Sequence, residues 1–147
     1  MTDHARIVIV NNIRVYVADL DFVERYEDER LGPEPYQGEC AAGVQTVFAE
    51  AGKPLGLTRT WRQGLRVATN DIPVGAAIAS FQNGLYAGDH AAILAEKTDR
   101  GLLVWDQFNN PPKSWSTRLL RFSSSGDRSN NGNLFYTIRA NTTANTN

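Results

Sequence analysis

One amphipathic helix is the feature that most constrains how this chain can fold. From residue 40 onward, apolar side chains recur every three or four positions, at Ala41, Val44, Val47, Phe48 and Ala51. This spacing places them on one stripe of a helix, which has to be buried against another layer of structure. Gly52 followed by Pro54 is a typical helix stop. The rest of the chain must therefore supply a surface that covers this stripe.

Short runs rich in β-branched and aromatic residues can supply that surface. Residues 6–10 and 13–17 are separated by Asn11-Asn12, a pair that tolerates the left-handed turn of a hairpin. Further strands are expected after the helix, at residues 75–81, 90–96, 102–108, 118–122 and 134–139. We interpret residues 19–30 as a short helix or an irregular acidic segment, and residues 58–69 as a polar connection. One helix followed by antiparallel strands predicts an α+β fold.

The chain of 147 residues is long enough for one domain with a sizeable core. We expect this domain to cover residues 1–140, with 1–30 as an N-terminal extension and 141–147 as a flexible tail. No apolar run reaches the length of a membrane-spanning helix, and residues 7–10 are too short for the core of a signal peptide. We therefore expect synthesis in the cytoplasm without a cleavable signal peptide. A formal net charge of −1 argues against a protein built mainly to bind nucleic acid.

Cys40, the single cysteine of the chain, begins the predicted helix directly after Gly38 and Glu39. A thiol at a helix N-terminus is exposed to the positive end of the helix dipole, which favours the thiolate. The unpaired N–H groups there can also bind the oxyanion that forms when a carbonyl is attacked. Taken alone, such a cysteine is more often a small apolar residue of the helix.

A histidine and an acid complete a possible catalytic set. His4 lies near the N-terminus, whereas His90 opens an expected strand and can deprotonate a nucleophilic thiol. A third group should orient the imidazole, and Asp106 and Gln107 lie on the next strand. With the four-residue connection 98–101, or with one bulge, either of them can share a face with His90. We favour Asp106 because a carboxylate both fixes the tautomer and stabilises the imidazolium. The alternative is an acid and an amide at a strand end, facing water.

Other side chains are candidates for the oxyanion hole or the cleft. The backbone N–H of Cys40 would be one oxyanion donor, and Gln37 or Tyr36 a second. Gln107 and Trp61 are further cleft candidates, although core packing is the simpler interpretation of a tryptophan. No cofactor is expected. A metal hydrolase built on Asp89, His90 and Asp106 is a weaker alternative, because the chain lacks a paired metal-ligand motif.

Five segments carry a resemblance to a known family: residues 38–45, 61–64, 75–81, 90–93 and 104–107. Together they resemble a small bacterial family of cysteine amidases related to the CHAP and NlpC-type cysteine peptidases. The resemblance implies a papain-like α+β fold, in which the nucleophile begins a helix packed on an antiparallel sheet. It also implies hydrolysis of amide bonds in peptidoglycan stem peptides or cross-bridges. The roles carried over are nucleophile for Cys40, base for His90 and third member for Asp106.

Some members of that family resemble antibacterial effectors delivered by type VI secretion. This implies export by a specialised system, action in the periplasm or cell wall, and an immunity protein as a possible partner. The N-terminal hairpin, the acidic segment and the Asn-rich C-terminus are not part of the motif. Two other outcomes stay open: an inactive wall-binding or inhibitor module on the same fold, and acyl transfer to an amine in place of hydrolysis.

Overall fold

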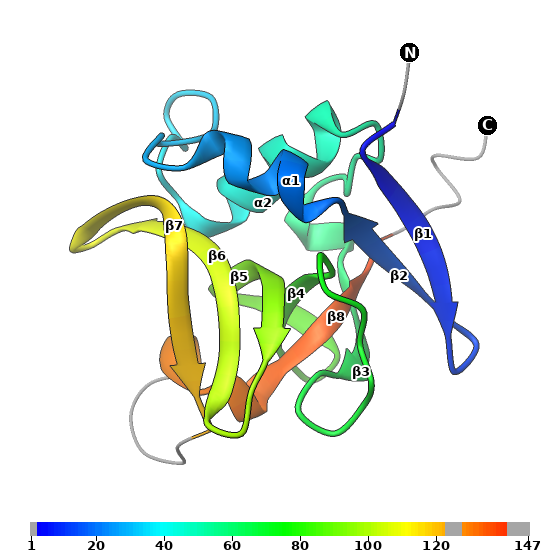
Figure 1. Cartoon of the computed structure of the whole chain (residues 1–147). Helices are drawn as coiled ribbons and strands as arrows, with labels where there is room; N and C mark the ends of the chain where they lie inside the picture. The colour runs from blue at the N-terminus through cyan, green and yellow to red at the C-terminus, as the bar shows by residue number, and fades with distance from the viewer. Residues whose placement is uncertain (1–2, 123–127, 141–147) are drawn as a thin grey trace.

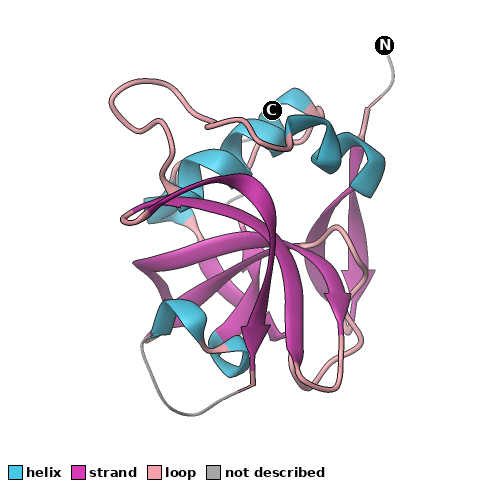
Figure 2. Ribbon diagram, turned by 60° about the vertical axis from the view of Figure 1, so that its left-hand side comes forward, coloured by secondary structure: helices cyan, strands magenta, loops and turns pink. Residues whose placement is uncertain are grey.

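A six-stranded antiparallel sheet forms the centre of the protein, whose computed structural model describes residues 3–122 and 128–140 (Figure 1). The strand order is β3-β8-β4-β5-β6-β7. These strands are β3 (Arg62–Arg66), β4 (Ala77–Gln82), β5 (Leu85–Lys97), β6 (Gly101–Asn109), β7 (Pro112–Arg121) and β8 (Phe135–Arg139). One further pair, Arg62 with Leu85, joins β3 to β5. The sheet therefore curls back on itself, as its curved strands show (Figure 2).

The longest helix, α2 (Cys40–Glu50), packs on the sheet as its apolar stripe predicts. Val44, Val47 and Phe48 are fully buried, and the helix contacts mainly β5 and β6. Gly52 has a positive φ of 98°, the left-handed conformation expected just after a helix end. The remaining helical segments are short: α1 (Leu20–Val23), η1 (Glu24–Tyr26), η2 (Thr58–Thr60), η3 (Arg128–Asn130) and η4 (Gly132–Leu134).

The two faces of the sheet bury separate apolar clusters, because side chains alternate along a strand. Ala91 and Ile93 of β5 belong to the cluster beneath α2. Ala92 and Leu94 belong to the cluster on the opposite face. Small residues on the helix side let α2 lie close to the sheet. A Cβ atom added to Gly43 would come within 2.8 Å of the Trp115 ring.

A separate hairpin of β1 (Ala5–Val10) and β2 (Ile13–Ala18) precedes this unit. Asn11 and Asn12 both have positive φ, so the predicted turn is confirmed. The hairpin contributes Tyr16 to the cluster beneath α2 and Val17 to the cluster on the other face, and β2 lies against β8. None of the helices in the described part of the chain is long and apolar enough to cross a membrane.

Three predictions about the strands were wrong. The expected polar connection 58–69 contains η2 and β3, which is short, polar and hard to recognise by alternation. Strand β5 begins at Leu85, directly after the Asn83-Gly84 turn, and not at residue 90. Strand β7 begins at Pro112, which is tolerated because β7 is an edge strand and proline is its first residue. The expected tail 141–147 lies outside the described residues, and the extent of the single domain stays a prediction.

Candidate active site

Cys40 is the first residue of α2 and is partly exposed. The loop before α2 is hydrogen-bonded to the side chain of Gln107, which is fully buried on β6. The Gln107 amide accepts a hydrogen bond from the Leu31 N–H at 2.8 Å and donates to the carbonyls of Leu31 and Glu39 at 3.0 and 2.7 Å. Gln107 therefore fixes the backbone that leads into the helix. With its amide engaged in this way, it is available neither to orient His90 nor to contact a substrate.

His90 and Asp106 form a buried pair between the neighbouring strands β5 and β6. The imidazole Nε2 lies 2.7 Å from the Asp106 Oδ2, and the two side chains are 3% and 0% exposed. Because an ionised carboxylate only accepts hydrogen bonds, Nε2 donates to it. The other ring nitrogen, Nδ1, is therefore the one available to a thiol.

A bulge in β5 decides which residue meets His90. The register between β5 and β6 changes by one residue along the ladder. Leu94 pairs with Val104 and Ile93 with Trp105, whereas Glu96 pairs with Leu103 and Lys97 with Leu102. One extra residue therefore lies on β5 between 94 and 96. If the register of Ile93 and Trp105 is continued to His90, Asp106 lies on the same face of the sheet as His90. The two residues are then diagonal neighbours, whose side chains can reach each other. Without the bulge, the same continuation would place Gln107 there.

Two cations surround the Asp106 carboxylate. Lys113 Nζ donates to Oδ1 at 2.9 Å, and Arg118 donates to Oδ2 through Nε at 3.0 Å and Nη2 at 2.8 Å. Burial alone would raise the pKa of Asp106, but the hydrogen bond and charge of His90, and then Arg118, lower it to about 2. Asp106 is therefore ionised throughout the physiological range. Arg118 Nη2 also lies 3.2 Å from His90 Nε2.

The thiol and the imidazole each shift the titration of the other. Burial tends to lower the pKa of His90, but hydrogen bonds to Asp106 and Cys40 and both negative charges raise it to about 9. Burial tends to raise the pKa of Cys40, but the hydrogen bond and charge of His90, and then a hydrogen bond from Tyr86, lower it below its ordinary value. These opposite shifts favour a thiolate–imidazolium pair near neutral pH.

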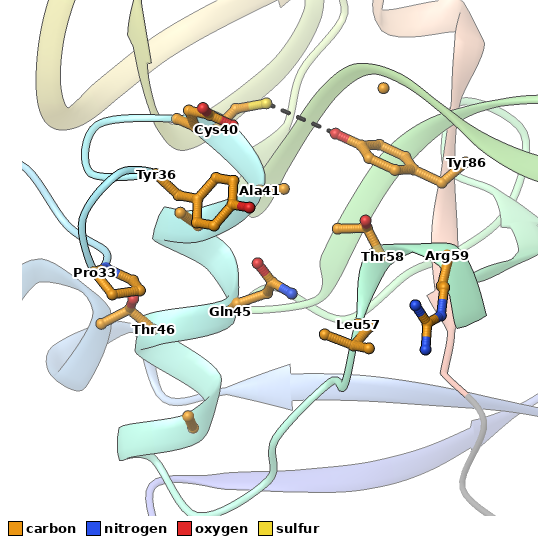
Figure 3. A pocket seen from close by; sticks show the side chains of 14 residues that line it. Pro33, Tyr36, Cys40, Ala41, Gln45, Thr46, Leu57, Thr58, Arg59 and Tyr86 are labelled. Atoms are coloured by element: carbon orange, nitrogen blue, oxygen red, sulfur yellow. Dashed lines mark hydrogen bonds between the residues drawn. The ribbon is translucent and has the colours of Figure 1, made fainter.

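Tyr86 also points at the sulfur from β5. Its hydroxyl oxygen lies 3.7 Å from the Cys40 Sγ, as the close view shows (Figure 3). The ring packs against the buried Trp61, with ring centroids 5.0 Å apart. Burial, followed by the nearby Cys40, raises the pKa of the phenol well above its usual range. Tyr86 therefore stays protonated and can donate a hydrogen bond.

Two cavities meet at Cys40. The larger, of about 730 Å³, is lined mostly by apolar groups, among them Ala41, Leu57 and Tyr86 (Figure 3). The smaller, of about 500 Å³, is lined by His90 and by polar residues that include Arg118. A chain-like substrate can therefore extend to both sides of the sulfur.

The remaining residues that the sequence suggested for the oxyanion hole or the cleft lie at different distances from the two cavities. Tyr36 lies at the rim of the larger cavity and is 57% exposed. Gln37 is exposed, lines neither cavity, and accepts a hydrogen bond from Asn109 through its carbonyl. Trp61 is not a cleft residue, because it is fully buried and donates through Nε1 to the Leu55 carbonyl.

The metal alternative finds no support in this geometry. Asp89 pairs with Arg128 at 2.6 Å, while Asp106 is held by two cations. In residues 3–122 and 128–140, no group of three or more His, Cys, Asp or Glu side chains is placed to hold a metal ion.

Sequence reasoning missed Tyr86, Lys113 and Arg118. Tyr86 lies on the part of β5 that precedes the expected strand start. Lys113 and Arg118 come from β7, and their meeting at Asp106 depends on the pairing of that strand with β6. The only sequence signal for Tyr86 is its position between the Asn83-Gly84 turn and His90.

Comparisons with known proteins agree with this architecture. A family model described as domesticated amidase effector 2 matches residues 19–138. The domesticated amidase effector 2 of Ixodes scapularis is 34% identical over 117 residues, covering 72% of this chain and 80% of that protein. A solved structure of type 6 secretion amidase effector 2 matches with a TM-score of 0.64 and 27% identity, covering 80% of this chain and 91% of that chain. The predicted papain-like, NlpC-type α+β fold is thereby confirmed, and the chain belongs to the domesticated amidase effector 2 family.

Proposed function

We propose that this protein hydrolyses amide bonds in peptidoglycan stem peptides or cross-bridges, with Cys40 as nucleophile, His90 as base and acid, and Asp106 as the residue that orients His90. The observation that carries the proposal is a thiol at a helix N-terminus beside an imidazole whose other nitrogen is held by a buried carboxylate. Membership in a family of amidase effectors supports the same reaction class.

The first half of the reaction transfers the acyl group to the sulfur. The Cys40 thiolate attacks the carbonyl carbon, and the carbonyl oxygen becomes an oxyanion. The N–H groups of the first helical turn have no partner within the helix, so the Cys40 N–H can donate to that oxygen. His90 then protonates the leaving nitrogen, the C–N bond breaks, and a thioester forms. Because His90 lines the smaller cavity, the leaving amine departs on that side.

The second half releases the acyl group. Neutral His90 takes a proton from water, the resulting hydroxide attacks the thioester carbon, and the Cys40 thiolate leaves. Asp106 keeps the imidazole in one orientation throughout and stabilises each imidazolium that forms.

Delivery and partners extend the proposal. The structural relative is named as a type 6 secretion effector, which supports export by a specialised system and action in the periplasm or cell wall. An immunity protein that covers the two cavities would be the matching inhibitor in producing cells.

Mass spectrometry of peptidoglycan fragments tests the proposal. Purified muropeptides and cross-linked sacculi are incubated with the wild type, with Cys40→Ala and with Cys40→Ser. We expect new fragments with the wild type only, and their masses identify the bond. Unchanged fragments with folded wild-type protein would contradict wall hydrolysis. Equal biological activity of wild type and Cys40→Ala would instead favour a binding module.

A further inference from the structure

We propose that the Tyr86 hydroxyl is a catalytic group, which donates the second hydrogen bond of the oxyanion hole. This inference rests on the proposed role of Cys40 as nucleophile. It replaces Tyr36 and Gln37, the two side chains that sequence position alone suggested for this donor.

The position of the hydroxyl suits an oxyanion formed at the sulfur. Tyr86 Oη lies 3.7 Å from Cys40 Sγ, which leaves room for an oxygen on the attacked carbon to lie within hydrogen-bond distance of the phenol. Tyr86 lines the larger cavity and His90 the smaller one, while Cys40 lines both. A carbonyl attacked by Cys40 can therefore direct its oxygen toward Tyr86 and its leaving nitrogen toward His90.

The donor is held in place before any substrate binds. The Tyr86 ring packs against both Trp61 and Phe81, at centroid distances of 5.0 and 6.4 Å. Trp61 is itself fully buried and anchored by its 3.1 Å hydrogen bond to the Leu55 carbonyl. Fixed donors of this kind stabilise the transition state most effectively, because they need not reorganise during the reaction.

The chemistry of the step is that of an ordinary oxyanion donor. A C–S bond forms from Cys40, and the electron pair of the C=O double bond moves onto oxygen. Tyr86 donates a hydrogen bond to this oxygen and keeps its proton. When the bond to the leaving group breaks, the electron pair returns and the carbonyl is restored.

The other two candidates lack this geometry. Tyr36 is 57% exposed at the cavity rim, so its hydroxyl is not held in a fixed orientation by packing. Gln37 lines neither cavity.

The test compares two reactions of the same thiolate. Acylation of Cys40 by p-nitrophenyl acetate passes through an oxyanion, whereas alkylation by iodoacetamide does not. Both rates are measured on the wild type, on Tyr86→Phe and on the matched control Tyr136→Phe. Tyr136 also packs on Phe81, but it lines neither cavity. Urea unfolding shows that each variant is folded.

We expect Tyr86→Phe to slow acylation by about 100-fold, the loss typical of removing one oxyanion donor. Alkylation should fall by less than about threefold, because His90, which lowers the thiol pKa more than Tyr86 does, is still present in the variant. Tyr136→Phe should leave both rates unchanged. An equal loss in both reactions would overturn the proposal, since Tyr86 would then act only on the thiolate. Unchanged acylation would overturn it as well. If the wild type is acylated but leaves peptidoglycan intact, the substrate proposal fails and the Tyr86 comparison still stands.

Discussion

Replacing Asp106 by Asn is the sharpest test of the proposed catalytic set. The substitution keeps the size and shape of the side chain but removes the negative charge of the carboxylate. This carboxylate accepts hydrogen bonds from His90, Lys113 and Arg118. The two cations and the imidazole then surround a neutral amide. The imidazolium loses its carboxylate partner and lies beside uncompensated positive charge.

The size of the effect follows from the pKa values of the buried pair. The pKa of His90 rises from 6.5 to about 9, which corresponds to about 3 kcal/mol. This net rise contains an opposing effect of burial and a further contribution from Cys40, so it sets the order of magnitude for Asp106. The fall of the Asp106 pKa from 3.8 to about 2 corresponds to about 2 kcal/mol. The equilibrium constant for forming the imidazolium should therefore decrease roughly 30- to 150-fold in Asp106→Asn.

The assay is the rate of Cys40 alkylation by iodoacetamide as a function of pH. With a weaker imidazolium partner, the thiol pKa rises, and the rate at pH 7 should fall at least about tenfold. The free energy of unfolding in urea should also fall by about 3 kcal/mol, near the lower end for breaking a buried ion pair, because Lys113 and Arg118 are partly exposed.

The control is Asp19→Asn, which removes an exposed carboxylate paired with Arg6. Its alkylation profile should match that of the wild type. The reasoning would be refuted if folded Asp106→Asn kept the wild-type alkylation profile, because Asp106 would then have no influence on the thiolate–imidazolium pair.

Further predictions concern packing and pH. Gly43→Ala should lower the free energy of unfolding by about 1–3 kcal/mol, because the new methyl group would meet Trp115 and Gln107 at 2.8 and 3.0 Å; urea unfolding measures it. Gln107→Leu removes three hydrogen bonds to the loop before α2, so it should destabilise the fold and slow iodoacetamide alkylation of Cys40 at pH 7. A normal alkylation rate would show that other contacts fix the loop. The His90 contribution to stability should be complete below pH 6.5 and lost as the pH rises through about 9. The Asp106 contribution should be complete above pH 3.8 and lost as the pH falls through about 2; urea unfolding across pH checks both.

Local patterns in the sequence were sufficient for the fold class. The apolar stripe after Cys40 predicted α2, and the Asn11-Asn12 pair predicted the first hairpin. Both signals depend on neighbouring residues along the chain, so they can be recognised without any knowledge of the fold. The same holds for the selection of Cys40, since its position at a helix start is a local property.

Tertiary structure alone decided the surroundings of His90. One bulge in β5 places Asp106 on the face of His90 and Gln107 beneath α2, whereas an unbulged ladder would exchange them. Side-chain direction alternates with every residue, so a shift of one position reverses the face. Lys113 reaches the same carboxylate from β7, the other strand of the β6–β7 hairpin, and the register of that hairpin decides this contact.

The position of Tyr86 could not be predicted from local sequence patterns either. Its hydroxyl meets Cys40 only because β5 starts before His90 and passes the N-terminus of α2, and because buried Trp61 supports the ring. The sequence by itself determined which elements form and which nucleophile is present. Strand register and packing determined which polar groups surround the sulfur, because contacts between distant segments arise only when the whole core is assembled.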